Sequence, residues 1–459
     1  MAIPPEHKGR FMYQFTHLQN LPTILQHGLL SYNEKAARGI GHISIAEESI
    51  QARRARMTVP CGPGGVIHDY VPFYFCSRSS MLLAVVNAKN VDQEFLIYLA
   101  VPIDILERPE CVFTSASANT EVPPIFYSDV SRLVELDWRS IDAPQWSMPS
   151  DKEKQARMAE GMVHRSLAVT EISHIIVWSD AIKKMVERQY TAAGLVAPKT
   201  ESEKVQRRHF YYTRFNERNK SSIVTGPMIL LVRYETTLEA IRTGRAESPP
   251  ESPQFKGVVD AVEKLKANFA LLPELTAIET LETDNKEHCQ SVGDHTKQVV
   301  AKLLALDSYQ TLGDREKSIA ILSAYLHDIG KGKSPRSNGK QKADPDHPAR
   351  GLRLLVRILT EEFVELSAED VRQIAMLVCY HDLIGDVIGK GRDRNQILEI
   401  VKWPNDFDML AALCLADVSS LIRDDWAAIL SPHANWLVRI KSGLPELREW
   451  VLANLKKAE

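Results

Sequence analysis

The segment from residue 244 to residue 255 is the feature that most constrains how this chain can fold. It reads Gly-Arg-Ala-Glu-Ser-Pro-Pro-Glu-Ser-Pro-Gln-Phe, with three prolines in a short stretch. Because proline lacks a backbone N–H donor and has a fixed φ, this composition disfavours a helix or central strand and favours an extended linker. At 459 residues the chain also exceeds one ordinary domain. We therefore expect two domains, residues 1–243 and 256–459, joined by a linker over residues 244–255.

Hydrophobic patterning differs between the two halves. In the first half, short β-branched and aromatic runs predict strands over residues 11–16, 70–75, 94–101 and 172–178. Helices are expected over residues 21–27, closed by Gly28, and 151–164. In the second half, apolar residues recur at helical spacing over residues 292–306, 316–326, 348–359, 368–380 and 409–422. The patterns predict an α+β first domain and an all-α second domain.

Charge and cysteine usage narrow the class of protein. The net charge of −3 argues against a surface that binds nucleic acid as a whole, so such a site has to be a local basic patch. The chain starts without an apolar signal region, no apolar run reaches the length of a membrane span, and the six cysteines form no Cys-x-x-Cys pair. We expect a cytoplasmic protein with reduced thiols and no membrane partner.

One local basic patch is present at residues 204–220, where positive charges alternate with four aromatic side chains. That composition suits a surface that follows a nucleic-acid backbone and stacks its bases. An edge strand with basic residues outward and aromatic residues inward explains the same alternation without any ligand. Both interpretations remain open at this stage, and the edge strand is the simpler one.

The most legible chemistry in the second half is the pair His327 and Asp328, at the end of an apolar helical run and before Gly330 and Lys331. Imidazole and carboxylate are the ligand types that borderline and hard divalent metals prefer. Each such residue alone is more often an ordinary core or surface residue. Further ligand-type residues follow the same order along five expected helices: His295, His347, His381 and Asp417.

This order resembles the HD superfamily of metal-dependent phosphohydrolases, over about residues 286–423. The resemblance implies one metal held by four of these residues, namely His295, His327, Asp328 and Asp417. The histidines at 347 and 381 imply a second metal, and iron, manganese, zinc and nickel all suit such ligands. Positive charge from Lys331 and the loop after it (Lys333, Arg336, Lys340, Lys342) would face the phosphoester substrate.

Motifs in the first half are weaker one by one. Arg53 and Arg54 are typical of a surface pair, Glu160 of a solvated helix position, and the glycine-rich residues 62–65 of a turn into a strand. Together the segments resemble the DarT family of DNA ADP-ribosyltransferases, over about residues 9–212. The strings that carry the resemblance are Tyr13-Gln-Phe-Thr-His17, Ile50-Gln-Ala-Arg-Arg54, Tyr70-Val-Pro-Phe-Tyr-Phe-Cys-Ser-Arg-Ser-Ser-Met-Leu82 and Ala159-Glu-Gly-Met-Val163.

The DarT resemblance implies an α+β domain with a central antiparallel or mixed sheet, NAD as substrate, and Glu160 and Arg54 as the catalytic residues. Residues that would hold the nicotinamide and its ribose are Gln14, Phe15 and Thr16, with Thr23 and Ser31 on the same wall, and Arg54 would contact the cofactor as well. The acceptor would be a base of single-stranded DNA, with RNA left open. The resemblance further implies a toxin or anti-phage effector with an antitoxin partner. Two positions depart from the family, since Gln14 is often histidine and Ser80 is usually proline.

Three hypotheses for the whole chain follow. In the first, both halves are enzymes, and the phosphohydrolase restrains, reverses or complements the transferase. In the second, the HD half is the working nucleotide or nucleic-acid phosphohydrolase, and the first half senses NAD or nucleic acid without transfer. In the third, both pockets are relics on a scaffold. The target base, the metal and the phosphoester are not fixed by the sequence.

Overall fold

The computed structural model describes residues 2–45, 48–120, 122–203, 210–212, 224–248, 250–283, 290–334, 336–342, 344–422 and 432–455. Contacts divide the chain into two compact units. The first unit comprises residues 1–87 and 91–220, and the second comprises residues 88–90 and 221–459. Within the described residues, no helix is both long enough and apolar enough to cross a bilayer.

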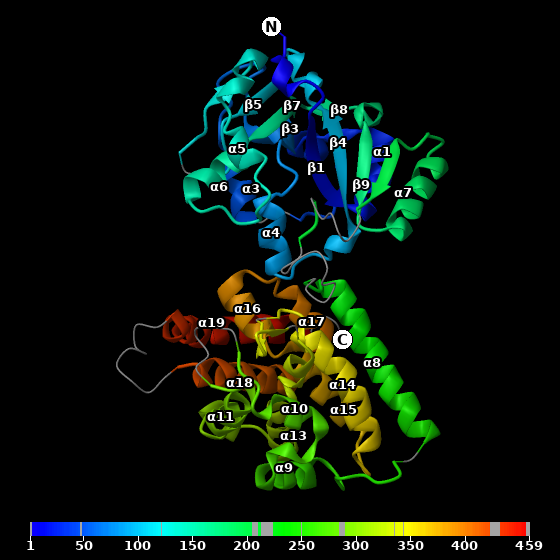
Figure 1. The fold of residues 1–459 in the computed structure, drawn as a ribbon, viewed down its shortest axis with the longest axis vertical. Coiled ribbons are helices and arrows are strands. Elements are labelled where there is room, and N and C mark those ends of the chain that lie inside the picture. The colour runs from blue at the N-terminus through cyan, green and yellow to red at the C-terminus, as the bar shows by residue number, and fades with distance from the viewer. Residues whose placement is uncertain are drawn as a thin grey trace. The chain divides into compact units, whose positions relative to one another are not determined.

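The first unit is built on a sheet of eight strands in the order β10-β9-β4-β1-β3-β7-β5-β6 (Figure 1). The strands are β1 (Phe11–His17), β3 (Tyr70–Tyr74), β4 (Leu96–Pro102), β5 (Cys111–Thr114), β6 (Phe126–Tyr127), β7 (Glu160–His164), β9 (His174–Val177) and β10 (Lys199–Ser202). Strand β10 pairs with β9 in parallel and the other pairs are antiparallel. The expected α+β class with a mixed sheet is therefore confirmed for this half.

Short helices surround this sheet: α1 (Leu21–His27), α2 (Tyr32–Ala37), α3 (Glu48–Arg54), α4 (Ser80–Asn87), α5 (Trp138–Ile141), α6 (Asp151–Arg157) and α7 (Asp180–Ala192). Gly28 ends α1 with φ 76°, and a Cβ there would lie 2.6 Å from the Leu167 carbonyl oxygen. The leucine after it begins β2 (Leu29–Leu30), which pairs with β8 (Ser166–Leu167). A residue with a side chain could not take the place of Gly28 without displacing backbone.

The expected helix over residues 151–164 is wrong in its second half. Helix α6 ends at Arg157, and Glu160 begins strand β7 instead. Strand β7 lies between β3 and β5, and pairing on both sides provides backbone partners that a local pattern does not reveal.

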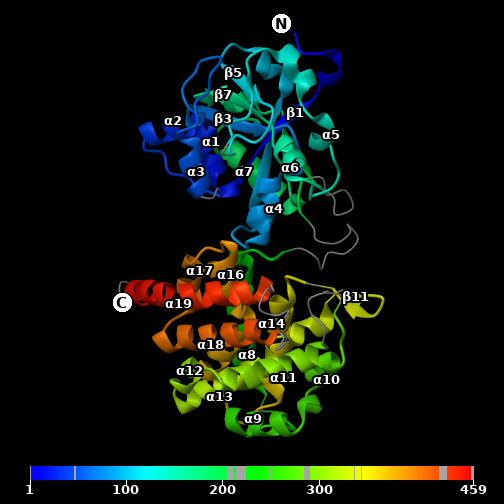
Figure 2. The same cartoon turned by 90° about the vertical axis from the view of Figure 1, so that its left-hand side faces the viewer.

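The second unit is helical, which confirms the all-α expectation at the level of secondary structure. Its long helices are α8 (Pro227–Glu247), α9 (Val258–Ala267), α11 (Val292–Leu304), α13 (Asp314–Leu326), α14 (His347–Glu361), α15 (Ala368–Tyr380), α18 (Pro404–Ser420) and α19 (Pro432–Leu455). Shorter helices are α10 (Pro273–Glu279), α12 (Asp307–Gln310), α16 (Leu383–Lys390) and α17 (Asn395–Ile400), and a small hairpin joins β11 (Arg336–Ser337) to β12 (Lys340–Gln341). Helix α18 packs against α19 on one side and against α11 and α13 on the other (Figure 2).

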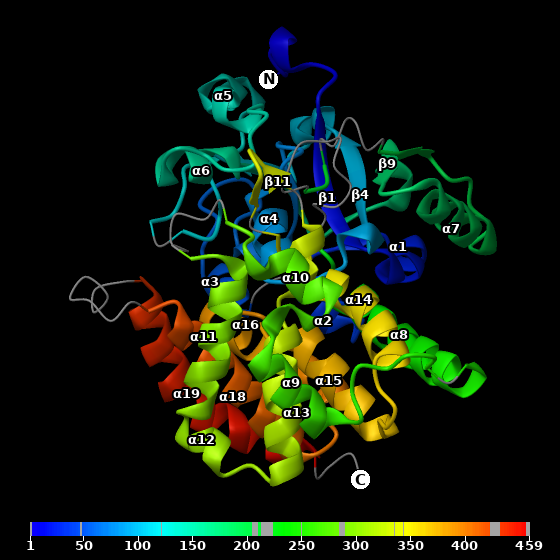
Figure 3. The same ribbon diagram turned by 60° about the horizontal axis from the view of Figure 1, so that its bottom comes forward.

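Helix α8 belongs to this second unit and packs against α14 and α15 (Figure 3). Its buried residues Leu230, Tyr234 and Ile241 are part of the same apolar core. The sequence prediction placed residues 227–243 in the first domain and began the linker at residue 244. In the structure α8 continues to Glu247, because the first proline of the segment comes only after it.

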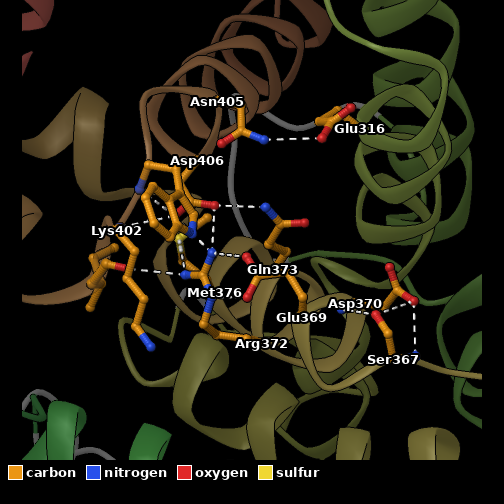
Figure 4. Close-up of polar contacts among 12 residues, drawn as sticks. Glu316, Ser367, Glu369, Asp370, Arg372, Gln373, Met376, Lys402, Asn405 and Asp406 are labelled. Atoms are coloured by element: carbon orange, nitrogen blue, oxygen red, sulfur yellow. Dashed lines mark hydrogen bonds and ion pairs between the residues drawn. The ribbon is translucent and has the colours of Figure 1, made fainter.

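A buried ion pair joins α15 to α18 (Figure 4). The Arg372 guanidinium donates to both carboxylate oxygens of Asp406, at 2.6 and 2.7 Å. The same carboxylate accepts from the Gln373 side chain at 2.8 Å and from the backbone N–H groups of Lys402 and Trp403 at 2.9 and 3.1 Å. These bonds satisfy the charge of Asp406, which is fully buried near the start of α18.

Candidate active site and candidate metal centre

A cavity of about 880 Å³ lies in the first unit. Gln14, Phe15 and Thr16 of β1 and Thr23 of α1 line it, together with Arg54 and Glu160. The sheet register explains how distant segments meet there, because Tyr74 of β3 pairs with Tyr13 on one side and with Glu160 on the other. The wall is thus formed by three neighbouring strands and the helices at their ends.

Arg54 and Glu160 form a bidentate ion pair at this cavity. Arg54 is the last residue of α3, Glu160 is the first residue of β7, and the two N···O distances are both 2.9 Å. Both side chains are almost fully buried. The planar guanidinium matches the carboxylate in the geometry that gives the strongest charge-assisted hydrogen bonds.

Two further groups hold Glu160 in place. The backbone N–H of Ala118 donates to Glu160 Oε1 at 3.1 Å, and the backbone N–H of Glu160 donates to Thr114 Oγ1 at 3.1 Å. The Thr114 hydroxyl in turn donates to the Ala116 carbonyl at 2.7 Å. Glu160 is therefore held both at its carboxylate and at its backbone N–H.

The charges of the pair change neighbouring pKa values. Burial alone would lower the pKa of Arg54, but the attraction and hydrogen bonds of Glu160 reverse this and raise it. Burial, and after it the Glu160 carboxylate, raises the pKa of the Tyr74 phenol. Burial, and after it the Arg54 charge, lowers the pKa of His68 on the cavity wall. The guanidinium therefore stays charged and the neighbouring phenol stays neutral near neutral pH.

In the second unit, the six predicted ligand-type residues come together in two clusters. One cluster joins His295, His327 and Asp417, and the other joins Asp328, His347 and His381, with the potential ligand atoms of each cluster within 4.8 Å of one another. Asp328 faces both, since Oδ2 lies 3.3 Å from His327 Nε2 and Oδ1 lies 3.2 Å from His347 Nε2. One carboxylate between two groups of ligands is the arrangement of a bridged pair of metals.

Each of the four histidines in the two clusters has an oxygen atom within hydrogen-bond distance of its Nδ1 atom. The backbone carbonyls of Ala324, Asp344 and Val378 lie 2.7, 2.8 and 2.9 Å from Nδ1 of His327, His347 and His381, each three residues before the histidine it contacts. The Ser420 hydroxyl lies 3.0 Å from Nδ1 of His295. A carbonyl can only accept, so these three rings donate from Nδ1, which leaves a lone pair on Nε2 for a metal.

Two buried atoms at the centre of the clusters, His327 Nε2 and Asp328 Oδ1, make no hydrogen bond among the described residues, although they face other ligand-type atoms at 3.3 and 3.2 Å. Because buried polar atoms are normally paired, a bound cation would satisfy both. Burial would raise the pKa of Asp417, but the hydrogen bond and charge of His295 and the charge of His327 lower it to about 2. The donor set therefore fits one or two divalent cations.

A lysine stands beside this centre. The Lys331 ammonium donates to Asp328 Oδ2 at 2.5 Å, and its side chain keeps 16% of its surface exposed. Of the loop cations expected to face a phosphate, Arg336 and Lys340 lie on the exposed β11–β12 hairpin, Lys333 precedes it, and Lys342 follows it. Lys331 lies beside the ligand-type residues and is partly open to solvent, so it can contact an anionic substrate.

Residues 13–212 match the sequence model of the family described as "ssDNA thymidine ADP-ribosyltransferase, DarT". The chain is also 33% identical over 180 residues to the DNA ADP-ribosyl transferase of Thermus sp. (strain 2.9), covering 38% of this chain and 84% of that protein. The chain belongs to the DarT family.

Two further similarities concern known proteins. The solved structure "Thermus sp. 2.9 DarT in complex with ADP-ribosylated ssDNA" is similar at 30% identity and a TM-score of 0.41, covering 46% of this chain and 99% of that one. The bifunctional uridylyltransferase/uridylyl-removing enzyme of Cereibacter sphaeroides is 25% identical over 175 residues, which is 34% of this chain and 17% of that enzyme.

The structure of this DarT-family chain brings five of the six residues predicted to bind the cofactor to one cavity, together with Glu160, the predicted catalytic residue. Ser31 differs, because it is buried and caps α2 by accepting from the Glu34 backbone N–H at 3.2 Å, and the described cavity wall does not include it. The string Ser31-x-x-Glu34 is a typical start of a helix, so the sequence did contain a signal for this role.

Sequence reasoning assigned no role to three residues that support the DarT-family site, namely Thr114, Ala118 and Asn20. Thr114 and Ala118 hold Glu160, but neither belongs to a recognisable motif. Asn20 donates to Thr16 Oγ1 and to the Ile43 carbonyl, both at 3.0 Å, and accepts from the Ile43 backbone N–H at 2.8 Å. Asn20 therefore links β1 to the segment that leads toward α3, a role visible only once the chain has folded.

The basic and aromatic stretch at 204–220 lies largely outside the described residues. Of its aromatic residues, Phe210, Tyr211 and Tyr212 are described, and they pack inward. Tyr98 contacts the rings of Phe210 and Tyr211 at centroid distances of 5.0 and 5.5 Å, and the Tyr211 hydroxyl donates to the Leu96 carbonyl at 2.7 Å. These rings are part of the fold, but residues 210–212 do not form a strand, so the edge-strand interpretation is not confirmed for this piece.

Proposed function

We propose that the first unit is an ADP-ribosyltransferase that uses NAD to modify a base of single-stranded DNA. The observation that carries this proposal is the buried Arg54–Glu160 pair at a cavity that Gln14, Phe15 and Thr16 also line. Membership of the DarT family and the DNA ADP-ribosyl transferase of Thermus support it. A toxin or anti-phage role with an antitoxin partner belongs to the same proposal.

The residue types suit this chemistry. Breaking the bond between nicotinamide and ribose leaves positive charge on the sugar, and a fixed carboxylate such as Glu160 stabilises that charge where it forms. A nitrogen of the acceptor base then bonds to the ribose carbon, nicotinamide leaves, and the base loses its proton. Arg54 keeps the carboxylate ionised and oriented, and its guanidinium can contact the pyrophosphate or assist the proton transfer.

The acceptor is proposed to be single-stranded because base pairing hides the reactive nitrogen of the base. The cavity of about 880 Å³ is at the upper end of the size range of small-molecule sites and leaves room for a dinucleotide and an acceptor group. Its basic rim includes Arg53 and Lys154, which can meet the phosphates of either ligand.

The test is transfer of label from NAD to a mixed single-stranded oligonucleotide, compared with duplex DNA and single-stranded RNA of the same sequence. Glu160→Gln should lower the rate at least about a hundredfold, the size of effect expected for loss of a transition-state charge. Glu171→Gln is the matched control, because Glu171 is partly exposed, pairs with Arg108 and is not part of the described cavity wall. A wild-type protein that adds no label overturns the proposal, and NAD binding without transfer would favour a sensor.

We infer that the second unit is a metal-dependent phosphohydrolase of the HD type. The observation that supports it is the gathering of six ligand-type residues in two clusters, where the buried atoms His327 Nε2 and Asp328 Oδ1 make no hydrogen bond in the described part of the chain. The first metal would be held by His295, His327, Asp328 and Asp417, and the second by Asp328, His347 and His381. Bound divalent cations would polarise a phosphoryl group and lower the pKa of a bound water. Lys331 would neutralise charge on the substrate.

Metal analysis and hydrolysis of bis(p-nitrophenyl) phosphate test this inference together. Purified protein should contain one or two equivalents of a transition metal, and Asp417→Asn should lower both metal content and hydrolysis. Asp408→Asn is the matched control, since Asp408 lies on the same helix and pairs with Arg448 at the surface. Metal-free wild-type protein that also fails to take up added Mn²⁺ would overturn the inference.

A further inference from the structure

Helix α8 contacts the residues that precede both histidines of the second cluster. Arg233 and Tyr234 are neighbours on α8, and they face two different helices of the same unit. Arg233 reaches toward Asp346, which directly precedes His347, and Tyr234 packs on Tyr380, which directly precedes His381. Two neighbouring residues of α8 thus contact the residues directly before two ligands that are far apart in the sequence.

The contact on the His347 side is a chain of hydrogen bonds. Arg233 Nη1 donates to the Thr225 hydroxyl at 3.0 Å, and that hydroxyl donates to the Asp346 carboxylate. The Asp346 backbone N–H donates to the Asp344 carboxylate at 3.0 Å, and the Asp344 carbonyl accepts from His347 Nδ1 at 2.8 Å. The position of the His347 ring is therefore linked to α8 through the loop of residues 344–346.

The contact on the His381 side is a ring contact with one hydrogen bond. The rings of Tyr234 and Tyr380 meet edge to face, with centroids 5.7 Å apart. The Tyr234 hydroxyl donates to the Arg372 carbonyl at 3.2 Å, within the same helix that ends at Tyr380. Both tyrosines are buried, so the end of α15 rests directly on α8.

The histidines of the first cluster are held by other elements than α8. His327 is held by the carbonyl of Ala324 in its own helix, and His295 is held by Ser420 of α18. Between the two rings that α8 supports, the Nε2 atoms of His347 and His381 lie only 3.1 Å apart. Two ligand atoms bind one ion at a fixed separation, so an element that sets the positions of both rings controls the affinity of that one site.

We propose that α8, together with Thr225 just before its start, sets the affinity of the second metal position, with Thr225, Arg233 and Tyr234 as the positioning residues. The proposal rests on the metal-dependent function inferred above and goes beyond it, because it makes the two metals separable. Loss of the contacts to α8 should weaken the second metal alone, and outer contacts of this kind change metal affinity about 10–100-fold.

The experiment is a titration of the full-length apoprotein with Mn²⁺, followed by counting bound metal per chain. Thr225→Val removes the hydroxyl and keeps the shape of the side chain, and Tyr234→Leu removes the ring. At a Mn²⁺ concentration that just fills both wild-type positions, each variant should hold about one equivalent, with the second affinity lowered at least about tenfold. Thr225→Ser should restore the second equivalent, and circular dichroism should show that the helical content is kept.

Arg242→Ala is the matched control, since Arg242 is on the exposed face of α8 and, within the described residues, pairs with Glu239 alone. It should bind two equivalents with wild-type affinity. Variants that keep both metals at wild-type affinity would overturn the role of α8 and leave the phosphohydrolase inference standing, as would folded variants that lose both metals in parallel. A wild-type chain that binds no Mn²⁺ would overturn the phosphohydrolase inference itself, and the role of α8 with it.

Discussion

Arg54 and Glu160 are joined by two parallel N–H···O bonds of 2.9 Å although they are separated by more than a hundred residues in the chain. With 9% and 1% of their side chains exposed, neither charge has access to much water. The pair is the point at which the end of a helix and the start of a central strand become one site. Its geometry gives the first prediction.

Arg54→Lys should abolish most of the NAD-dependent labelling although the positive charge is kept. An ammonium is a point charge and cannot reproduce the two parallel hydrogen bonds of a guanidinium, so the Glu160 carboxylate loses its orientation. We expect a loss of at least about a hundredfold in label transfer, measured as initial rate at saturating NAD. Arg56→Lys serves as control, because Arg56 is exposed and its side chain donates to the Ala52 backbone carbonyl. Equal rates for the two variants would contradict the prediction.

Thr114→Val should slow the transfer of ADP-ribose, because it removes the hydrogen-bond acceptor for the backbone of β7 at Glu160. The hydroxyl of Thr114 is the acceptor for the Glu160 backbone N–H, and valine leaves that buried donor unpaired. An unpaired buried donor costs about 1–3 kcal/mol. The free energy of unfolding should therefore fall, and Glu160 should be held less firmly in its position. The rate at saturating NAD should fall about tenfold while KM for NAD changes little, because Glu160 acts in the transition state. Thr114→Ser restores the hydroxyl, and failure of this variant to recover the rate would count against the role.

The separate elements of the first unit were easier to predict than the place of Glu160. The expected strand at residues 11–16 and the helix at 21–27 follow local patterns, and the structure contains both. Glu160 follows a charged helix with no turn residue between them, so a local pattern continues the helix through it. Its strand exists because β3 and β5 pair with it on both sides, and such long-range pairing is absent from any window of sequence.

The ligand-type residues of the second unit could be predicted because their order along the chain resembles that of the HD superfamily. His327 and His381 each directly follow a helix, and the structure brings all six residues together. Asp328 was expected among the ligands of the first metal, and in the structure it faces both clusters, since two oxygens of one carboxylate can point in different directions. Helix α8 was missed because its supporting contacts are with residues 346 and 380 rather than with its own neighbours.

Gly330→Ala should disrupt the second cluster through the backbone. A Cβ on Gly330 would lie 2.0 Å from the His347 carbonyl oxygen and 2.7 Å from the Gly351 nitrogen, so α14 would have to move away from Asp328. Because the clashing atoms are backbone, no side-chain rotation relieves the overlap. We expect loss of the second Mn²⁺ equivalent and a lower melting temperature. Gly332→Ala is the control, since the nearest atom to its Cβ is a methyl carbon of Ile278 at 3.3 Å.

The Gly330 prediction fails if both variants bind metal alike. It also distinguishes backbone packing from charge, because neither glycine carries a group that could bind a cation. A Gly330→Ala chain that keeps two equivalents would show that α14 can shift without moving His347 away from Asp328.

Asp406→Ala should destabilise the second unit strongly, because it removes the carboxylate that neutralises Arg372 inside the protein (Figure 4). The side chain of Arg372 is 7% exposed, and its other ion-pair partner in the described residues, Glu369, is at the surface. Breaking a buried pair from one side typically costs about 3–5 kcal/mol, since the remaining charge stays desolvated. Asp408→Ala, on the same helix but in an exposed pair with Arg448, should cost less than about 1 kcal/mol.

The stabilities of the Asp406→Ala and Asp408→Ala variants are compared by urea unfolding followed by circular dichroism. Equal unfolding midpoints would contradict the prediction and show that Arg372 reaches water once its partner is gone. A double variant, Arg372→Met with Asp406→Ala, should recover much of the loss, because it removes the uncompensated charge itself.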